Sequence, residues 1–556
     1  MPGERLRRSA RAQALGALFA LVCPLACLAG TDGAESCREW LSKGFVFRAP
    51  VAKLLAGDFL GHRATPPVDW ACSNILDRSY CFRLHGFFAL DPVLREYEAA
   101  PDGRCGGFLH DFVLDWVRAN PTPLEGNEWA WHDDATARRV HRMSYCYKYL
   151  RSLWNEAELA EIKSSLDAQA RLLVSDSFYS SRHNHGMYQD LALVSYSLCV
   201  CDDDAWRKAC MDKAISRSLE YFDYAFCENG VHKEHSPAYG RDVALAAHAF
   251  AKLTEEYDPA ASKRYEAHYR KARRFLVLCT MPDGKWPSVG DSAEVKAGYE
   301  PETASVFSDG EAGGGYAIFR SSWHDPPGAA TWIMFQAATF GSAHKHSDDL
   351  SFILYHRGDL FVEAGNRDYN YLDPMTAYVY SGYAHNVMCA DDADFPVKVG
   401  KNGFRSVLGD AFKTRITGSV LEGSVVSATG VQERFPGIVQ RRTLSYDRIG
   451  RTVRVADEIE TDHGFKASFL FHVAPGVSVE ETGSGIRLLR NGSEIAEMRF
   501  SSDAPAKARV VAGEGEPPYR TWIFNGRRSP SHGSLVIFDV ACKKGANFAE
   551  AEIRLK

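Results

Sequence analysis

The sequence predicts two unlike parts, an α-helical array or toroid followed by an antiparallel β-sandwich. Residues 36–280 carry apolar side chains at helical spacing, residues 281–314 are dense in Gly, Pro and Asp, and the remainder consists of short β-rich runs between turn residues. Helices first and strands afterwards indicate separate α and β domains. A site in such a protein is expected where the two domains adjoin.

Length and composition agree with a globular protein of more than one domain. The chain has 556 residues, too many for one ordinary core, with 45% hydrophobic and 24% charged residues. Its net charge of −6 leaves no basic footprint for nucleic acid. An anionic substrate would therefore need a locally basic cleft, and the oligomeric state is not indicated.

The first thirty residues, 1–30, are typical of an export signal. Arg5, Arg7 and Arg8 precede an apolar run over 14–29, which Pro24 interrupts. A membrane anchor is the alternative, but the run is short for a span and no later stretch is long and apolar enough. We expect cleavage, no stable membrane span, and a periplasmic or secreted protein.

The helical part is clearest over 153–173 and 241–253. In the first segment Leu159, Ile162, Leu166, Ala170 and Leu173 recur at intervals of three and four, which places them on one helix face. Twelve cysteines lie beyond the signal without a C-x-x-C pair, so no zinc ribbon or thioredoxin-type site is indicated. Disulfides and buried free thiols are both compatible with their spacing.

The β part is predicted from runs rich in β-branched and aromatic residues. The expected strands are 332–337, 350–355, 360–363, 443–446, 453–456, 468–472, 486–489 and 534–540.

One stretch of this second part, 339–352, places two histidines and two acids in a run that otherwise predicts a strand. In an extended backbone His344, His346 and Asp348 would line one side and Lys345 would point away. Buried polar groups are costly unless they bind something. This side is a candidate active-site wall, and an exposed strand with a solvated face is the alternative.

The helical part contributes three further polar clusters. Residues 182–186 hold an amide and two imidazoles beside Gly186, and residues 228–239 hold several titratable groups between Gly230 and Pro237. In 129–139, tryptophans adjoin acids and arginines. Flat rings suit stacking on sugars and arginines suit carboxylates or sulfates, although an amphipathic helix start with core tryptophans explains this third cluster equally well.

Together these motifs resemble the heparinase II/III-like group of polysaccharide lyases over most of the mature chain. The matching segments, in order, are 184–186, 230–239, 284–291, 344–352, 361–365 and 384–386. The resemblance implies an incomplete (α/α) toroid over 36–300, a β-sandwich over 313–556, and eliminative cleavage of uronate-containing polysaccharides.

Such an elimination needs three tasks, for which the chain carries suitable residues. The enzyme must neutralise the uronate carboxylate, remove the C5 proton and protonate the departing O4. Asn184 suits the first task, and His185 and Tyr239 suit the base and acid roles, whose assignment depends on the C5 configuration. The resemblance implies that Tyr239 is the usual acid. His344 would come from the sandwich and assist at the carboxylate or the leaving group.

Further residues are expected around this centre. Substrate binding is expected from Trp131, His132, Arg138, Glu234, His235 and Arg367. His346, Glu363 and His385 match positions that hold a structural zinc ion in several members, and two imidazoles with a carboxylate are an acceptable set for that metal. Asp348 competes as a ligand. No organic cofactor is expected.

The leading hypothesis is thus a lyase acting on an anionic polysaccharide, preferably a glycosaminoglycan such as heparan sulfate, hyaluronan or chondroitin. Alginate or a bacterial exopolysaccharide is the alternative substrate. A metal-dependent hydrolase is disfavoured because no H-E-x-x-H helix is present. A non-catalytic polysaccharide-binding protein of the same fold is disfavoured because Asn184, His185, Tyr239 and His344 occur together.

Overall fold

A computed structural model describes residues 36–72, 78–124, 127–293, 307–308, 315–401, 403–407, 414–526 and 529–556. The expected export signal and most of the expected boundary at 294–314 lie outside these residues. The described chain forms two compact units. One contains Phe226–Asp242 and Arg270–Lys556, and the other contains the described part of Ala17–Ala225 together with Val243–Tyr269. The segment with Glu234, His235 and Tyr239 thus packs with the strands, although the sequence placed it in the helical domain.

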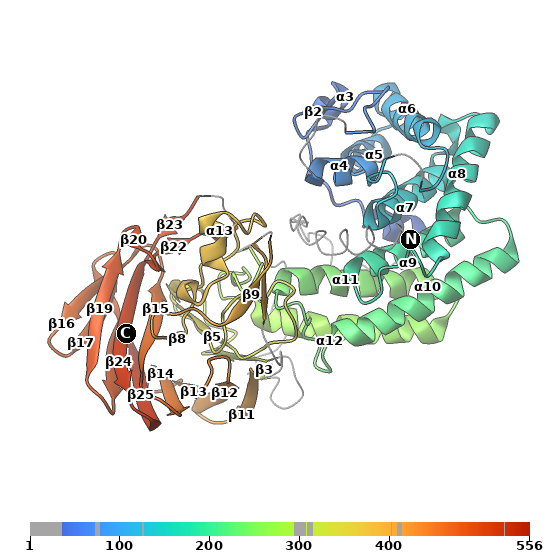
Figure 1. The fold of residues 1–556 in the computed structure, drawn as a ribbon. Helices are drawn as coiled ribbons and strands as arrows, with labels where there is room; N and C mark the ends of the chain where they lie inside the picture. Colours follow the sequence, from blue (N-terminus) through green and yellow to red (C-terminus); the bar gives the residue numbers. More distant parts are fainter. Residues whose placement is uncertain are drawn as a thin grey trace, which may run out of the picture. The chain divides into compact units, whose positions relative to one another are not determined.

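The first half of the chain is helical, as predicted (Figure 1). Its helices are α2 (Cys37–Ser42), α3 (Val51–Leu55), α4 (Arg78–His85), α5 (Leu90–Ala99), α6 (Gly103–Ala119), α7 (Asp133–Tyr149), α8 (Glu156–Val174), α9 (Asn184–Cys199), α10 (Asp204–Ala225), α11 (Pro237–Thr254) and α12 (Pro259–Cys279). Helix α7 packs against α8 and α9, and α9 packs against α10.

Local hydrogen bonds explain where helices α8 and α9 begin. Asn155 caps α8 in a capping box with Glu158, and the apolar residues expected on one face are buried. At α9 the His183 side chain accepts the backbone N–H of His185, so the helix starts at Asn184. A Cβ on Gly186 would lie 2.3 Å from the Ser180 carbonyl oxygen, so only glycine fits there.

The second half builds two antiparallel sheets. One sheet has the order β11-β12-β13-β14-β25-β18-β17-β16, and the other has the order β19-β24-β15-β7-β6-β5-β4-β3 with β8 paired to β15. A single core cluster takes Phe335 and Leu354 from the second sheet and Val426 and Val455 from the first. The sheets therefore pack face to face as the predicted sandwich.

The strands of the eight-stranded sheet are β11 (Arg415–Val420), β12 (Val425–Gln432), β13 (Ile438–Asp447), β14 (Thr452–Thr461), β16 (Val477–Thr482), β17 (Gly485–Arg490), β18 (Ser493–Ser502) and β25 (Gly545–Leu555). Those of the other sheet are β3 (Phe307–Ser308), β4 (Tyr316–Arg320), β5 (Thr331–Gln336), β6 (Phe352–His356), β7 (Asp359–Phe361), β8 (Met388–Ala390), β15 (Phe465–Val473), β19 (Ala506–Ala512) and β24 (Ser534–Cys542). Each predicted strand overlaps one of these.

A buried arginine connects the sandwich to the segments that carry the polar motifs. Arg442 on β13 pairs with Asp457 on β14, and its Nη1 also donates to the carbonyl oxygens of Leu350 and Asn386. Leu350 is the last residue of the loop 339–350, and Asn386 directly follows His385. The sheet therefore holds both motif segments through one side chain.

Two other expectations concern the whole described chain. The twelve described cysteines are all free thiols. Among the described residues, every helix is either too short or too polar to cross a bilayer.

Candidate active site

Tyr239 and His344 meet in the unit that contains the sheets. Tyr239 lies near the start of α11, and its ring stacks on the His344 imidazole with 3.8 Å between centroids. The Tyr239 hydroxyl lies 2.6 Å from the hydroxyl of Tyr369. Tyr239 is only 8% exposed, and burial, followed by the nearby Tyr369 and Asp291, raises its pKa well above the usual value. The phenol is therefore protonated at neutral pH.

Two carboxylates hold the His344 imidazole. Its Nδ1 lies 2.6 Å from Asp291 Oδ2, and its Nε2 lies 3.4 Å from Glu234 Oε2. Burial alone would lower the pKa of His344, but the hydrogen bonds to Asp291 and Glu234 outweigh it and raise the pKa to about 9. A positively charged imidazolium therefore faces the Tyr239 ring at neutral pH.

Asp291 is the residue that connects the parts of this cluster, and sequence reasoning missed its role. Its Oδ1 accepts from the Tyr380 hydroxyl at 2.6 Å and lies 3.1 Å from His346 Nε2. Burial would raise the pKa of Asp291, but the hydrogen bonds from His344 and His346 lower it. The only sequence signal was its place at the end of the matching segment 284–291.

Gly290 lets Asp291 reach this position. Its φ is +52°, and a Cβ there would lie 2.4 Å from the His235 carbonyl oxygen and 2.9 Å from that of His344. Three backbone segments therefore approach one another where only glycine fits.

The extended backbone expected over 339–352 begins only at Phe352, the first residue of β6, because 339–351 consist of turns, bends and irregular backbone. His344 itself has a φ of +54°. His344 and His346 do point to the same side, since both contact Asp291, and Lys345 points the other way. Asp348 was expected beside the histidines but pairs with Lys345 instead.

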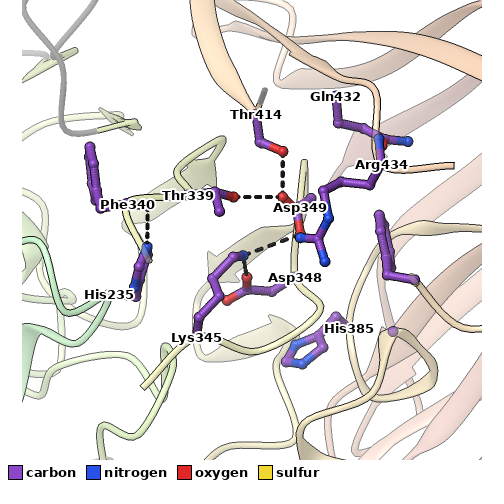
Figure 2. Close-up of polar contacts among 12 residues, drawn as sticks. His235, Thr339, Phe340, Lys345, Asp348, Asp349, His385, Thr414, Gln432 and Arg434 are labelled. Carbon is purple, nitrogen blue, oxygen red and sulfur yellow. Dashed lines mark hydrogen bonds and ion pairs between the residues drawn. The ribbon is translucent and has the colours of Figure 1, made fainter. Parts of the chain in front are cut away.

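Lys345 is buried in a cluster of four charges, which Figure 2 shows. Its Nζ contacts Asp348 and lies 3.3 Å from Asp349 Oδ2, which also accepts from Arg434 Nη1 at 3.0 Å. The hydroxyls of Thr339 and Thr414 donate to the other oxygen of Asp349. Two cations thus balance two anions, and Arg434 and Thr414 fasten the histidine-bearing loop to the eight-stranded sheet's side of the sandwich.

His235, which was predicted to bind substrate, is hydrogen-bonded to the backbone of this loop. It is 2% exposed, its Nε2 accepts the backbone N–H of Phe340 at 2.9 Å, and its Nδ1 lies 3.1 Å from the Ala343 carbonyl oxygen (Figure 2). Burial lowers its pKa to about 3, so the imidazole is neutral.

The other two predicted binding residues of this unit are also engaged by protein groups. Glu234 faces His344, and its side chain is 23% exposed. Arg367 pairs with Asp368 and Asp373 and donates to the Thr376 hydroxyl at 2.9 Å. These contacts orient both side chains before any ligand binds.

The predicted metal ligands lie close together, and their bonding suits a cation. The ring centroids of His346 and His385 are 5.4 Å apart, and all three ligands are at most 2% exposed. His346 Nε2 faces Asp291, and His385 Nε2 faces the Val379 carbonyl at 3.1 Å. If each Nε2 carries the proton, both Nδ1 lone pairs are left for a metal, as in many metal sites.

The two Nδ1 atoms support this interpretation. His346 Nδ1 is buried without a hydrogen-bond partner, and His385 Nδ1 contacts the Glu363 carboxylate, so two acceptors face each other. A proton or a cation between them would satisfy both. The ligand atoms of His346, Glu363 and His385 do not all lie within 4.8 Å of one another. Among the described residues, Glu96, Asp102 and Cys105 form a group that does meet this distance.

The helical unit carries the second half of the predicted constellation. His185 Nδ1 lies 3.2 Å from Asp133 Oδ2, and its Nε2 lies 3.9 Å from Asp134 Oδ2. Burial would lower the pKa of His185, but the carboxylates of Asp134 and Asp133 outweigh it and raise the pKa. The side-chain oxygen of Asn184 is buried and is an acceptor without a donor among the described residues.

The remaining predicted binding residues of this unit have different surroundings. His132 lies with its ring 5.8 Å from that of His185. Arg138 pairs with Asp134 at 3.0 Å, and its guanidinium lies 3.1 Å from the centroid of the Tyr188 ring. Trp131, the ring predicted to bind sugar, is 6% exposed and packs edge to face on Trp116.

Comparisons with known proteins agree with this organisation. A heparinase II/III N-terminal sequence profile matches residues 52–312, and a heparinase II/III-like C-terminal profile matches residues 308–538. No curated protein matches the chain. A solved structure named heparinase III is 14% identical with a TM-score of 0.69, covering 99% of this chain and 89% of that one.

A second solved structure, heparan sulfate lyase HepC from Pedobacter heparinus, is 15% identical with a TM-score of 0.64, covering 99% of this chain and 87% of that one. At these identities the two structures establish the fold, and the two profiles together account for most of the sequence. The chain belongs to the heparinase II/III-like family of polysaccharide lyases.

Proposed function

We propose that this lyase cleaves a 4-O-linked uronate-containing polysaccharide by β-elimination and leaves 4,5-unsaturated uronate ends. The preferred substrate class is a glycosaminoglycan, with heparan sulfate first, because the two similar structures are named heparinase III and heparan sulfate lyase. An anionic sugar also suits a centre with a cationic imidazole.

The observation that carries the proposal is the pair formed by Tyr239 and His344. A phenol with a raised pKa is protonated at neutral pH and can donate its proton to the departing O4. The His344 imidazolium, stacked on the phenol at 3.8 Å, stabilises negative charge that develops at the oxygen or at the uronate carboxylate. Tyr239 is therefore proposed as the general acid.

Asn184 and His185 are proposed to perform the other two tasks of the elimination. The Asn184 amide hydrogen-bonds the carboxylate or the enolate that forms from it, and His185 removes the C5 proton. Asp133 and Asp134 increase the basicity of His185, which favours proton abstraction. For the opposite C5 epimer, Tyr239 is the alternative base, and it then needs the His344 charge to stabilise its phenolate.

We also propose that His346, Glu363 and His385 hold a structural zinc ion. When bound, the ion would neutralise Glu363 and satisfy the two imidazole lone pairs, which would fix the loop that carries His344. The chemistry proposed above takes place on protein groups. Export to the periplasm or outside the cell, after removal of residues 1–30, is a further proposal, and the N-terminal sequence of the mature protein tests it.

The test of function is a panel of purified polysaccharides followed by ultraviolet absorbance. Elimination creates a conjugated 4,5-unsaturated uronate that absorbs ultraviolet light, whereas hydrolysis does not. We expect absorbance to rise with heparan sulfate, hyaluronan or chondroitin. A rise with alginate or an exopolysaccharide alone would replace the substrate class, and new reducing ends without absorbance would refute the elimination.

A further inference from the structure

We propose that Trp129 and Arg78 form a subsite that binds an anionic sugar residue beside His185. This subsite rests on the proposed function, because it extends the proposed substrate site along the helical unit. Both residues lie in the same compact unit as His185. The sequence favoured Trp131 and Arg138, rather than these two residues, for substrate binding.

Trp129 belongs to a row of rings that leads to His185. The Trp129 ring stacks on His132 at 5.5 Å with 19° between their planes, and His132 lies 5.8 Å from His185. Trp129 is half-buried, so part of its ring reaches solvent. A sugar bound to His185 thus has an aromatic ring close by against which the next residue of the chain can pack.

The two tryptophans of this motif contrast sharply. Trp131 is 6% exposed and packs on Trp116, whereas Trp129 follows a turn in which Asn127 accepts its backbone N–H at 2.8 Å. The turn directs the first indole to the surface and the second to the core. Trp129 is therefore the ring that a sugar can reach.

Arg78 supplies the positive charge. It is the first residue of α4, it is exposed, and its guanidinium carbon lies 5.4 Å from the centre of the Trp129 ring. Within the described chain no carboxylate pairs with Arg78. By contrast, Arg138 pairs with Asp134, and Arg139 donates to Gln169 and to backbone carbonyls. Of these three arginines, Arg78 is the one that has no carboxylate partner among the described residues.

The pair suits one chemical class of ligand, a sugar that carries an anionic group. The apolar face of the sugar packs on Trp129, and Arg78 binds the anion through charge-assisted hydrogen bonds. A uronate carboxylate and a sulfate ester both supply this anion. The substrate itself distinguishes them, because carboxyl-reduced and desulfated forms of one polymer can be prepared.

The test measures kcat and KM of the full-length enzyme on the polymer that it cleaves. We expect Arg78→Gln to raise KM about tenfold with kcat changed less than about twofold. Trp129→Ala should raise KM about fivefold, and Trp129→Phe should retain most of the affinity because it keeps a ring. Arg104→Gln, which removes an exposed arginine from the first turn of α6, is the matched control and should leave both constants unchanged.

Binding to modified polymers gives the sharper result. Arg78→Gln should weaken binding of the native polymer but no longer matter for the form that lacks the anion it binds, whether carboxyl-reduced or desulfated. Trp129→Ala should weaken binding of all forms. Circular dichroism and thermal melting establish that each variant is folded. If Trp129→Ala does not fold, Trp129→Phe replaces it in the binding measurements.

The outcomes separate this subsite from the proposed function. If the unmodified enzyme yields no ultraviolet-absorbing product from any acidic polymer, the proposed function fails. If it does yield product and Arg78→Gln and Trp129→Ala match Arg104→Gln in KM, the subsite is refuted. Equal weakening of Arg78→Gln towards native and anion-free polymers refutes the anion contact.

Discussion

The two groups of residues proposed for the elimination, one in each compact unit, both hold a histidine between two carboxylates, yet they differ in what they leave free. His344 is hydrogen-bonded to Asp291 and Glu234 and covered by the Tyr239 ring. His185 is held by Asp133 and Asp134, but its neighbour Asn184 has a buried oxygen without a partner. Both nitrogens of the His344 imidazole have a carboxylate partner, whereas the Asn184 oxygen is an acceptor that no donor among the described residues satisfies.

This difference suggests a division of labour. The His344 group supplies a proton from Tyr239 and a fixed positive charge from the imidazolium, because its side chains are already in place and need no rearrangement during reaction. The His185 group is proposed to bind the acidic sugar through the Asn184 side-chain N–H and to remove a proton from it. The following predictions test this division, beginning with the largest expected effect.

Tyr239→Phe removes the proposed acid while preserving the ring that stacks on His344. We expect kcat to fall by about a thousandfold, within the range usual for loss of general acid–base catalysis. Binding of the polymer should change little, and melting should show an intact fold. Near wild-type turnover would remove Tyr239 from the mechanism.

Lys345→Met breaks the four-charge cluster that fixes the His344 loop. Removing one partner of a buried ion pair leaves Asp348 uncompensated, so we expect the free energy of unfolding to fall by about 3–5 kcal/mol and kcat to fall with little change in KM. Lys345→Arg should restore part of both.

The matched control is Lys466→Met, because Lys466 pairs with Asp392 at the surface with side-chain exposures of 38% and 48%. Its loss should cost less than about 1 kcal/mol. If Lys345→Met lowers stability but leaves kcat of the folded enzyme unchanged, the cluster does not position His344.

His346→Ala removes one proposed zinc ligand. We expect the sandwich to lose about 3 kcal/mol of stability and the bound zinc, while the affinity for short oligosaccharides changes less. Thermal unfolding, elemental analysis and binding measurements check these three quantities separately. Carefully purified wild-type protein without zinc would contradict the reason given for the effect.

Asp133→Asn tests the basicity of His185 and should have the smallest effect near neutral pH. The carboxylate raises the pKa of His185, and a base acts only when deprotonated, so the wild-type rate falls as the pH drops through that pKa. Removing the charge lowers the pKa and moves the acidic limb of the kcat/KM profile to lower pH. A limb that stays in place, or moves upward, would show that His185 is not the base.

Much of the fold and part of the site follow from local patterns. The face of α8 and the strands of the sandwich depend on periodicities of the backbone itself, which a sequence displays directly. The clusters around His185 and Tyr239 were found because titratable residues are dense beside glycine and proline.

The failures have physical causes that no local pattern contains. His235 and His344 are similar in sequence context, but one is bonded to backbone atoms of Phe340 and Ala343 and the other to carboxylates. Burial lowers the first pKa to about 3, and the carboxylates raise the second to about 9. Likewise, Trp129 and Trp131 lie two residues apart in one turn, but Trp129 is half-buried and Trp131 is buried.

By itself, the sequence determined the two classes of secondary structure, their order along the chain and the residue types that an elimination needs, because these depend on neighbours in the chain. Tertiary structure alone decided that Asp291 connects His344 to His346, that Lys345 is buried, and that Arg78 rather than Arg138 lacks a carboxylate partner among the described residues. Charge and hydrogen bonding depend on groups brought together from distant positions, and only folding selects those partners.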